Sequence, residues 1–102
     1  MFEKIESTFG FIKFSQVDDF ADIHDVEVEF ESRGKGYGGK LMKLFLNEMK
    51  SRGVTVVTLE VRVENVVAIG LYEKFGFERA DVRKGYYKDG CDGLLMRLEI
   101  EK

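Results

Sequence analysis

Hydrophobic and polar residues follow two different periods along this chain, and each period predicts a type of element. Apolar residues alternate over about residues 9–17, 21–29, 54–63, 77–83 and 92–100, which indicates five strands. They recur at helical spacing over residues 38–53 and 66–76, which predicts two amphipathic helices. Gly53 and Gly76 stand where each helix should end, and Asn65 can cap the start of the second helix.

The second predicted strand contains an irregularity in its alternation. Ile23 points to one face of the strand, whereas Val26 and Val28 point to the other, because an odd number of positions separates them. This offset predicts a β-bulge near His24 and Asp25. A bulge bends a strand and often lies beside a functional site.

The predicted core is formed by apolar side chains that share a face of their element. They are Leu41, Leu44, Phe45 and Met49 in the first helix, Ala68, Leu71, Tyr72 and Phe75 in the second, and Val57, Leu59, Val61 and Val63 in the strand between them. Glu60 lies on the opposite face of that strand, beside Arg62.

The order of elements is strand, strand, glycine-rich loop, helix, strand, helix, strand, strand, which predicts a mixed α/β fold with a sheet covered by helices. At 102 residues, of which 44% are hydrophobic, the chain forms a single domain with a packed core. The first strand is expected to be internal, since its alternation changes face as in a strand covered on both sides.

Charge and cysteine content narrow the classes of partner. The net charge of −3 argues against a nucleic-acid-binding protein, since that function needs clustered Lys and Arg. Cys91 is the single cysteine, so no intrachain disulfide can form, and His24 has no second histidine with which to build a metal site. The apolar runs are too short to span a membrane and the N-terminal residues do not resemble a signal peptide, so we expect a cytoplasmic protein.

The segment 33-RGKGYGGK-40 fits three phosphate-binding patterns. All three place backbone N–H groups of a glycine-rich bend, at a helix N-terminus, against an anion. The nucleoside-triphosphate pattern GxxxxGK needs Ser or Thr after the lysine, where this chain has Leu41. The dinucleotide pattern GxGxxG needs an acidic residue at the end of the next strand, and Glu60 stands inside that strand. The third pattern is R/Q-x-x-G-x-G, which begins at Arg33.

Two further segments accompany the third pattern in matching order and spacing, TLEVRVENVVAIGLYEKFGF and VRKGYYKDGCDGLLMRLE. From about Phe9 to Ile100 the chain resembles the GNAT acyltransferase superfamily and, within it, the RimI-type protein N-terminal acetyltransferases. The resemblance implies a GNAT-like mixed sheet with a central parallel pair of strands and a β-bulge. It also implies that an amine, preferably a protein or peptide N-terminal α-amine, directly attacks acetyl-coenzyme A.

The resemblance assigns acetyl-coenzyme A to the glycine-rich loop, which would hold its pyrophosphate, and to the bulged strand, which would pair with its pantetheine arm. The backbone N–H of Val28 would also polarise the thioester carbonyl. Val26 and Val28 are equally compatible with core packing, and Asn65 with capping alone. The residues placed at the cofactor are Val26, Glu27, Val28, Arg33, Gly34, Lys35, Gly36, Tyr37, Gly38, Gly39, Asn65 and Lys74.

The resemblance also implies catalytic and substrate-binding roles. Glu60 matches the general base, although a carboxylate needs partial burial or a bridging water to take a proton from an ammonium group. Tyr72 matches the general acid that protonates the departing thiolate, and is equally compatible with a core position. Tyr86 and Tyr87 match a loop that grips the first residues of a peptide. That loop departs from the family pattern, in which E-D-A commonly stands where this chain has CDG at residues 91–93.

Full-length members of such a family carry a first strand and two helices ahead of the matching segment, whereas residues 1–8 have room for one short strand. We therefore expect an N-terminally truncated domain with an incomplete acceptor groove. Two hypotheses remain, an active N-acetyltransferase and a catalytically idle module that binds coenzyme A or another protein. Exposure of the sheet edge and of Phe9, Phe11 and Phe14 predicts a homodimer.

Overall fold

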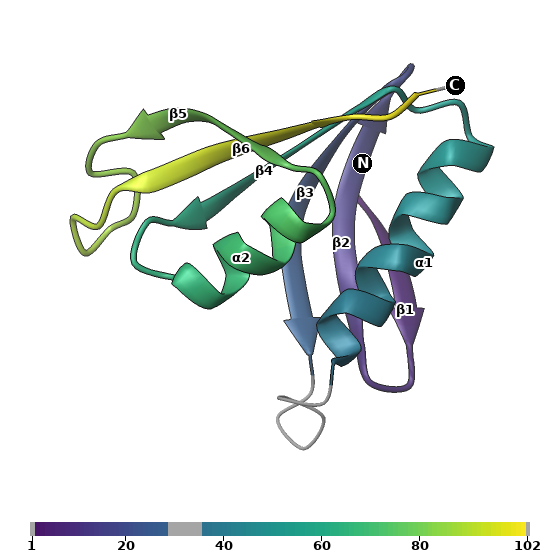
Figure 1. The fold of residues 1–102 in the computed structure, drawn as a ribbon, viewed down its shortest axis with the longest axis horizontal. Helices are drawn as coiled ribbons and strands as arrows, with labels where there is room; N and C mark the ends of the chain where they lie inside the picture. Colours follow the sequence, from purple (N-terminus) through teal and green to yellow (C-terminus); the bar gives the residue numbers. More distant parts are fainter. Residues whose placement is uncertain (1, 29–35, 102) are drawn as a thin grey trace.

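The computed structural model describes residues 2–28 and 36–101. Six strands form one mixed sheet in the order β1-β2-β3-β4-β6-β5, and both helices of the described part lie on one face of it (Figure 1). The elements are β1 (Glu3–Ser7), β2 (Gly10–Val17), β3 (Phe20–Val28), α1 (Tyr37–Ser51), β4 (Val56–Arg62), α2 (Val66–Lys74), β5 (Glu78–Arg83) and β6 (Gly93–Glu99). The predicted mixed α/β class is confirmed.

The centre of the sheet is a short parallel pair, β3 and β4. Their register covers four residue pairs, from Phe20–Val56 to Ile23–Leu59, and the other neighbours in the sheet are antiparallel. Beyond these pairs β3 continues along β2 to Val28, and β4 continues along β6 to Arg62. Figure 1 shows the two central strands diverging from this point.

The bulge in β3 lies where the parallel pairing ends. Phe14 of β2 pairs with Ile23 and the adjacent Lys13 pairs with Asp25, so His24 is an extra residue in β3. A bulge of this kind bends its strand and increases the local twist. The predicted bulge is therefore confirmed, and it falls one residue after the last pair between β3 and β4.

One continuous core fills the space between the sheet and the helices. The Phe14 ring of β2 meets the Phe45 ring of α1 edge-on, with 5.2 Å between centroids, and both side chains are fully buried. Burying a side chain of this size stabilises the fold by about 1.5–3 kcal/mol. The other fully buried residues of the core include Ile12, Ala21, Leu41, Met42, Met49, Val57 and Met96.

Some predicted core positions are wrong. Leu44 is 48% exposed and Val63 is 38% exposed, whereas Met42 and Ile69 are buried. The buried face of α1 contains Met42 in place of Leu44, and Val63 lies beyond the end of β4. In and just after the short helix α2 the predicted residues Ala68, Leu71, Tyr72 and Phe75 do belong to the core or pack against it, and Ile69 is a core member that the spacing did not include.

The first predicted strand is internal, because β1 pairs along β2 from Glu3–Phe14 to Ser7–Gly10. Its two faces differ, however, since the helices of the described residues cover only the face of Ile12 and Phe14. Phe14 is thus buried and was wrongly expected at an exposed surface. Neither α1 nor α2, the helices of the described residues, is long and apolar enough to cross a membrane.

Candidate active site

A cleft of about 460 Å³ opens where β3 and β4 part. The end of β3 forms one wall, α2 forms another, and the first turn of α1 closes one end. Its lining residues are Val26, Glu27, Val28, Gly36, Gly38, Gly39, Asn65, Val67, Ala68, Leu71 and Tyr72. Most of these residues were predicted to bind the cofactor. Val67, Ala68 and Leu71 were not predicted there, and the structure adds them to the lining of the cleft.

Glycines shape the end of the cleft at α1. Gly36 is the N-cap of the helix and has a φ of 78°, in the left-handed region that favours glycine. A Cβ on Gly38 would lie 3.3 Å from Cδ2 of Leu71, so the glycine allows α1 to pack closely on α2. The first turn of α1 contains no acidic residue, which leaves the partial positive charge of the helix N-terminus uncompensated on this element.

Three predicted cofactor residues, Arg33, Gly34 and Lys35, lie outside the described residues. Tyr37 begins α1, and its ring stacks on Phe9 with 4.4 Å between centroids. Because the ring is engaged in this way, the predicted contact of Tyr37 with the cofactor falls to its backbone. Asn65 lines the cleft and also caps α2, since its Oδ1 accepts a hydrogen bond from the backbone N–H of Ala68 at 3.2 Å. The capping interpretation of Asn65 is therefore confirmed, and its contact with the cofactor stays a prediction.

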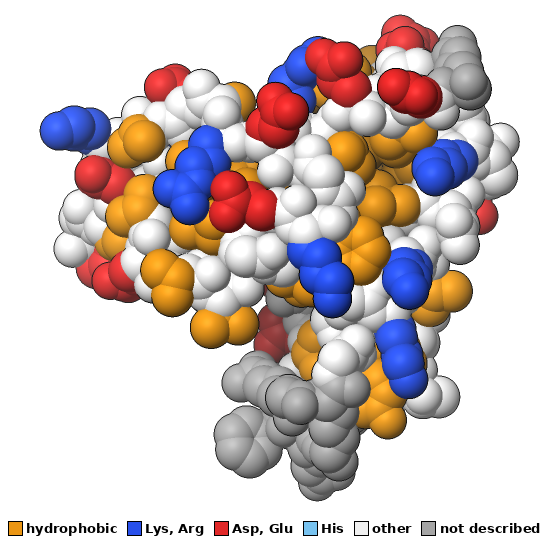
Figure 2. Space-filling model, viewed as in Figure 1, with side chains coloured by type: hydrophobic (Ala, Val, Ile, Leu, Met, Phe, Trp, Pro, Cys, Tyr) orange, Lys and Arg blue, Asp and Glu red, His pale blue; other side chains and the backbone are white. Residues whose placement is uncertain are grey.

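A second cavity of about 510 Å³ adjoins the cleft and shares Gly36, Gly39 and Leu71 with it. Lys40 and Lys43 of α1 and Lys74 of α2 line this cavity. Figure 2 shows positively charged side chains gathered over α1 and the adjoining end of α2. Together with the helix N-terminus, these ammonium groups provide the positive charge that a phosphate-bearing ligand requires.

Tyr72 extends from α2 into the cleft and is only 8% exposed. Burial raises the pKa of its phenol, and the neighbouring Tyr87 and Asp25 raise it further. The hydroxyl therefore stays protonated near neutral pH. A protonated phenol in this position can donate to a group that gains negative charge inside the cleft.

Glu60 lies on the face of β4 opposite the core, where it lines a small cavity of about 150 Å³ with Asp22, Ile23, His24, Tyr86 and Tyr87. Its Oε1 is 3.3 Å from Nε of Arg83 in β5. Burial raises the pKa of Glu60, Arg83 lowers it, and Asp22 raises it. The Glu60 side chain is 20% exposed, and Arg62, beside it on β4, binds Asp89 at 2.7 Å.

The loop between β5 and β6 brings Tyr86 and Tyr87 to the same small cavity. Their rings meet edge-on with 5.0 Å between centroids, and the Arg62 guanidinium lies 4.3 Å from the Tyr87 centroid. Arg62 also binds Asp89, which fixes the loop to the end of β4. Burial raises the pKa of Tyr87, with further contributions from Tyr86 and Glu60.

The two proposed catalytic side chains therefore occupy different cavities. Glu60 lies on the outer face of β4, and Tyr72 comes from a helix that covers the inner face. Tyr87 lines the cavity of Glu60 and contributes to the raised pKa of Tyr72.

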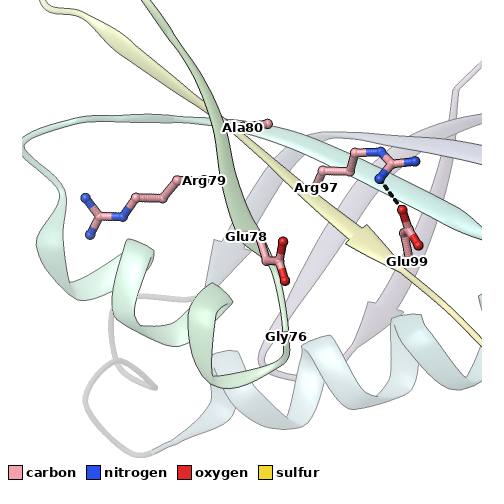
Figure 3. Close-up of a pocket in the computed structure, with 6 residues that line it drawn as sticks. All are labelled: Gly76, Glu78, Arg79, Ala80, Arg97 and Glu99. Carbon is pink, nitrogen blue, oxygen red and sulfur yellow. Dashed lines mark hydrogen bonds and ion pairs between the residues drawn. The ribbon is translucent and has the colours of Figure 1, made fainter.

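Another cavity, of about 380 Å³, lies between the end of α2 and strands β5 and β6 (Figure 3). Two ion pairs involve its lining residues, Arg97 with Glu99 and Arg79 with Glu73 of α2. It shares no lining residue with the cleft or with the cavity of Glu60. We assign it no part in the chemistry.

Comparison with known proteins agrees with this geometry. The chain matches the acetyltransferase (GNAT) family over residues 2–77. The [ribosomal protein bS18]-alanine N-acetyltransferase of Escherichia coli K12 is 38% identical over 85 residues, which cover 80% of this chain and 57% of that protein. This chain therefore spans little more than half the length of that relative.

Solved structures give the same result. The ribosomal-protein-S18-alanine N-acetyltransferase of Escherichia coli superposes with a TM-score of 0.87 at 35% identity, over 92% of this chain and 63% of that one. The NatC complex bound to Gag peptide and CoA superposes with a TM-score of 0.83 at 28% identity, over 91% and 62% of the two chains. By sequence and by fold, this chain belongs to the GNAT acetyltransferase family.

Proposed function

We propose that this chain transfers an acetyl group from acetyl-coenzyme A to a primary amine, in particular the α-amine of a protein or peptide N-terminus. The observation that carries the proposal is the cleft lined by the end of β3, the start of α1 and α2, with Tyr72 inside it and Glu60 on the opposite face of the sheet. The names of the bS18-alanine acetyltransferase and of the peptide-bound NatC complex support this class of acceptor.

Acetyl-coenzyme A supplies the activated acetyl thioester. The residues present fit such a ligand, because one cavity offers ammonium groups and the other offers a strand and apolar side chains. The start of α1 with Lys40, Lys43 and Lys74 would hold the phosphates, and Val26 to Val28 would line the extended arm. The predicted contacts of Arg33, Gly34 and Lys35 belong to the same proposal.

Glu60 is assigned to the acceptor. An α-ammonium must lose a proton before its nitrogen can attack a carbonyl carbon, and its pKa near ~8 makes it easier to deprotonate than lysine at ~10.4. Burial raises the pKa of Glu60, which narrows the difference between base and acceptor. Tyr86 and Tyr87 form the walls against which the first residues of a peptide would lie.

Tyr72 is assigned to the leaving sulfur. An unperturbed thiol has a pKa near ~8.5 and a phenol near ~10, so Tyr72 does not give up its proton spontaneously. Burial strengthens this tendency by raising the pKa of the phenol. The hydroxyl therefore donates a hydrogen bond first and passes its proton only as the carbon–sulfur bond breaks.

The test combines binding with turnover on one sample. Calorimetry with acetyl-coenzyme A should show binding, and mass spectrometry should show acetylation of N-terminal amines in a peptide panel. Glu60→Gln and Tyr72→Phe should each lower kcat by about 100-fold while acetyl-coenzyme A still binds. Glu78→Gln, an exposed carboxylate on β5, is the matched control and should retain activity.

Binding without turnover would select the idle coenzyme A-binding module, and absence of binding would refute both hypotheses. Acetylation that survives Glu60→Gln and Tyr72→Phe combined would refute the assigned chemistry. A cytoplasmic location and a homodimer remain part of the proposal. Light scattering at micromolar concentration measures the oligomeric state, and a monomeric mass would exclude the homodimer.

A further inference from the structure

Three side chains able to accept a proton line the small cavity at Glu60, and two of them are engaged elsewhere. Oδ1 of Asp22 accepts a hydrogen bond from Oγ1 of Thr58 at 2.7 Å, and its Oδ2 lies 3.7 Å from Nδ1 of His24. The second ring nitrogen of His24 lies 2.8 Å from Oγ of Ser15. Asp22 and His24 are therefore already engaged with each other and with side chains of β2 and β4.

Glu60 differs because its two oxygens have different surroundings. Oε1 contacts Nε of Arg83 at 3.3 Å, whereas Oε2 is buried and has no hydrogen-bond partner among residues 2–28 and 36–101. A buried acceptor without a donor costs about 1–3 kcal/mol. Oε2 is thus the atom of this cavity that gains most from an incoming N–H group.

The sheet explains how Arg83 reaches Glu60 from a strand that is not adjacent. Strand β6 lies between β4 and β5, and Gly93 of β6 pairs with Arg83 on one side and Arg62 on the other. Gly93 carries no side chain, so the guanidinium can cross β6 toward Glu60. Tyr86 packs over the same glycine, where a Cβ would come within 3.1 Å of its side chain.

We propose that Arg83 is a positioning residue for the acetyl transfer: it holds Glu60 through Oε1 and leaves Oε2 to take the proton of the acceptor amine. This inference rests on the proposed function. The proton moves from the ammonium nitrogen to Oε2, and the nitrogen lone pair thereby becomes available for attack. Arg83 keeps its own proton and touches neither the amine nor the acetyl group.

The charges around Glu60 support this role. Asp22 and His24 face it from β3, Tyr86 and Tyr87 from the loop, and Arg83 from β5. Burial and Asp22 raise the pKa of Glu60, and Arg83 lowers it. Without Arg83 the carboxylate would therefore be protonated, and unable to act as a base, at a higher pH than in the unaltered protein.

The experiment compares Arg83→Gln, Arg83→Lys and the unaltered protein, with kcat/KM for a peptide acceptor measured from pH 6 to pH 8.5. Arg83→Gln should lose roughly tenfold at pH 6 and clearly less at pH 8.5, where the remaining loss reflects a carboxylate that is ionised but no longer held. Arg83→Lys should recover most of the loss. The matched control is Arg79→Gln. Arg79 lies on the same strand, and its Nε is also 3.3 Å from a glutamate oxygen, that of Glu73. Arg79 does not line the cavity of Glu60.

An equal loss at every pH, or no loss at all, overturns the proposal. A second readout does not need turnover: the carboxyl ¹³C signal of Glu60, assigned by its absence in Glu60→Gln, is titrated without acetyl-coenzyme A. Its midpoint should rise in Arg83→Gln and stay near the original in Arg83→Lys and Arg79→Gln. An unchanged midpoint in Arg83→Gln refutes the control of Glu60 by Arg83. If the midpoint rises in Arg83→Gln but the unaltered protein acetylates no peptide, the proposed function is refuted and the control of Glu60 by Arg83 is not.

Discussion

Deletion of His24 tests whether the bulge opens the cleft. Because Phe14 pairs with Ile23 and Lys13 with Asp25, the deletion leaves both pairs in register and turns β3 into a regular strand. Ile23 and Val26 would then alternate normally, so Val26 and Val28 keep their present face. His24 is exposed and contributes no side chain to the core, which makes loss of the fold unexpected.

The size of the effect follows from strand spacing. Paired strands lie about 4.8 Å apart, and an extended guest between β3 and β4 needs roughly twice that separation. A regular β3 would continue its parallel register beyond Ile23–Leu59 and remove this space. We expect acetyl-coenzyme A to bind at least ~100-fold more weakly, which corresponds to about 2.8 kcal/mol.

The assay is calorimetry with acetyl-coenzyme A, paired with urea unfolding to confirm that the variant is folded. The control is His24→Ala, which removes the contacts with Ser15 and Asp22 but keeps the extra residue in the strand. It should bind acetyl-coenzyme A like the unaltered protein. A folded deletion variant that binds as tightly as His24→Ala would show that the bulge does not hold the strands apart.

Other substitutions test separate parts of the site. Gly10→Ala should destabilise the fold by about 3 kcal/mol in urea unfolding, because its Cβ would lie 2.1 Å from the backbone oxygen of Glu27; the control Gly70→Ala meets nothing within 4 Å and should not destabilise α2. Lys74→Ala should weaken acetyl-coenzyme A binding roughly fivefold at low salt and less at high salt, unlike Lys50→Ala. Gly93→Ala should displace Tyr86 and raise KM for the peptide without changing acetyl-coenzyme A affinity in calorimetry. Because the pKa of Glu60 is raised, the folded state binds the carboxyl proton of Glu60 more tightly than the unfolded chain does. Stability therefore falls as pH rises above the ordinary glutamate range. The free energy of unfolding of Glu60→Gln, relative to that of the unaltered protein, should increase from pH 4 to pH 7.

The features predicted from sequence are those that one element determines by itself. The bulge at His24 was visible as an odd offset between Ile23 and Val26, and the cap at Asn65 as a polar residue before an apolar helix. Leu44 was misplaced because the face of a helix that becomes buried depends on how the helix lies on the sheet.

The ion pair between Glu60 and Arg83 could not be predicted, because it depends on strand order. Only the placement of β6 between β4 and β5 brings the two side chains together across Gly93. A sequence signal existed in the glycine itself, since a residue without a side chain inside a strand often marks a close approach. That signal does not say which side chain makes the approach.

The separation of Glu60 and Tyr72 by the sheet explains why the bulge and the chemistry belong together. Alternation in β4 directs Glu60 outward and Leu59 inward, so no rotation of the glutamate side chain brings it to the face covered by α2. In a continuous sheet, hydrogen-bonded backbone would separate a base on one face from an acid on the other. In the proposed reaction, a thioester held where β3 and β4 part after Ile23 and Leu59 would be open to an amine from the face of Glu60 and to the phenol of Tyr72 from the other face. The proposed reaction therefore depends on the end of the parallel pairing beside the extra residue His24, because continued pairing would leave hydrogen-bonded backbone between Glu60 and Tyr72.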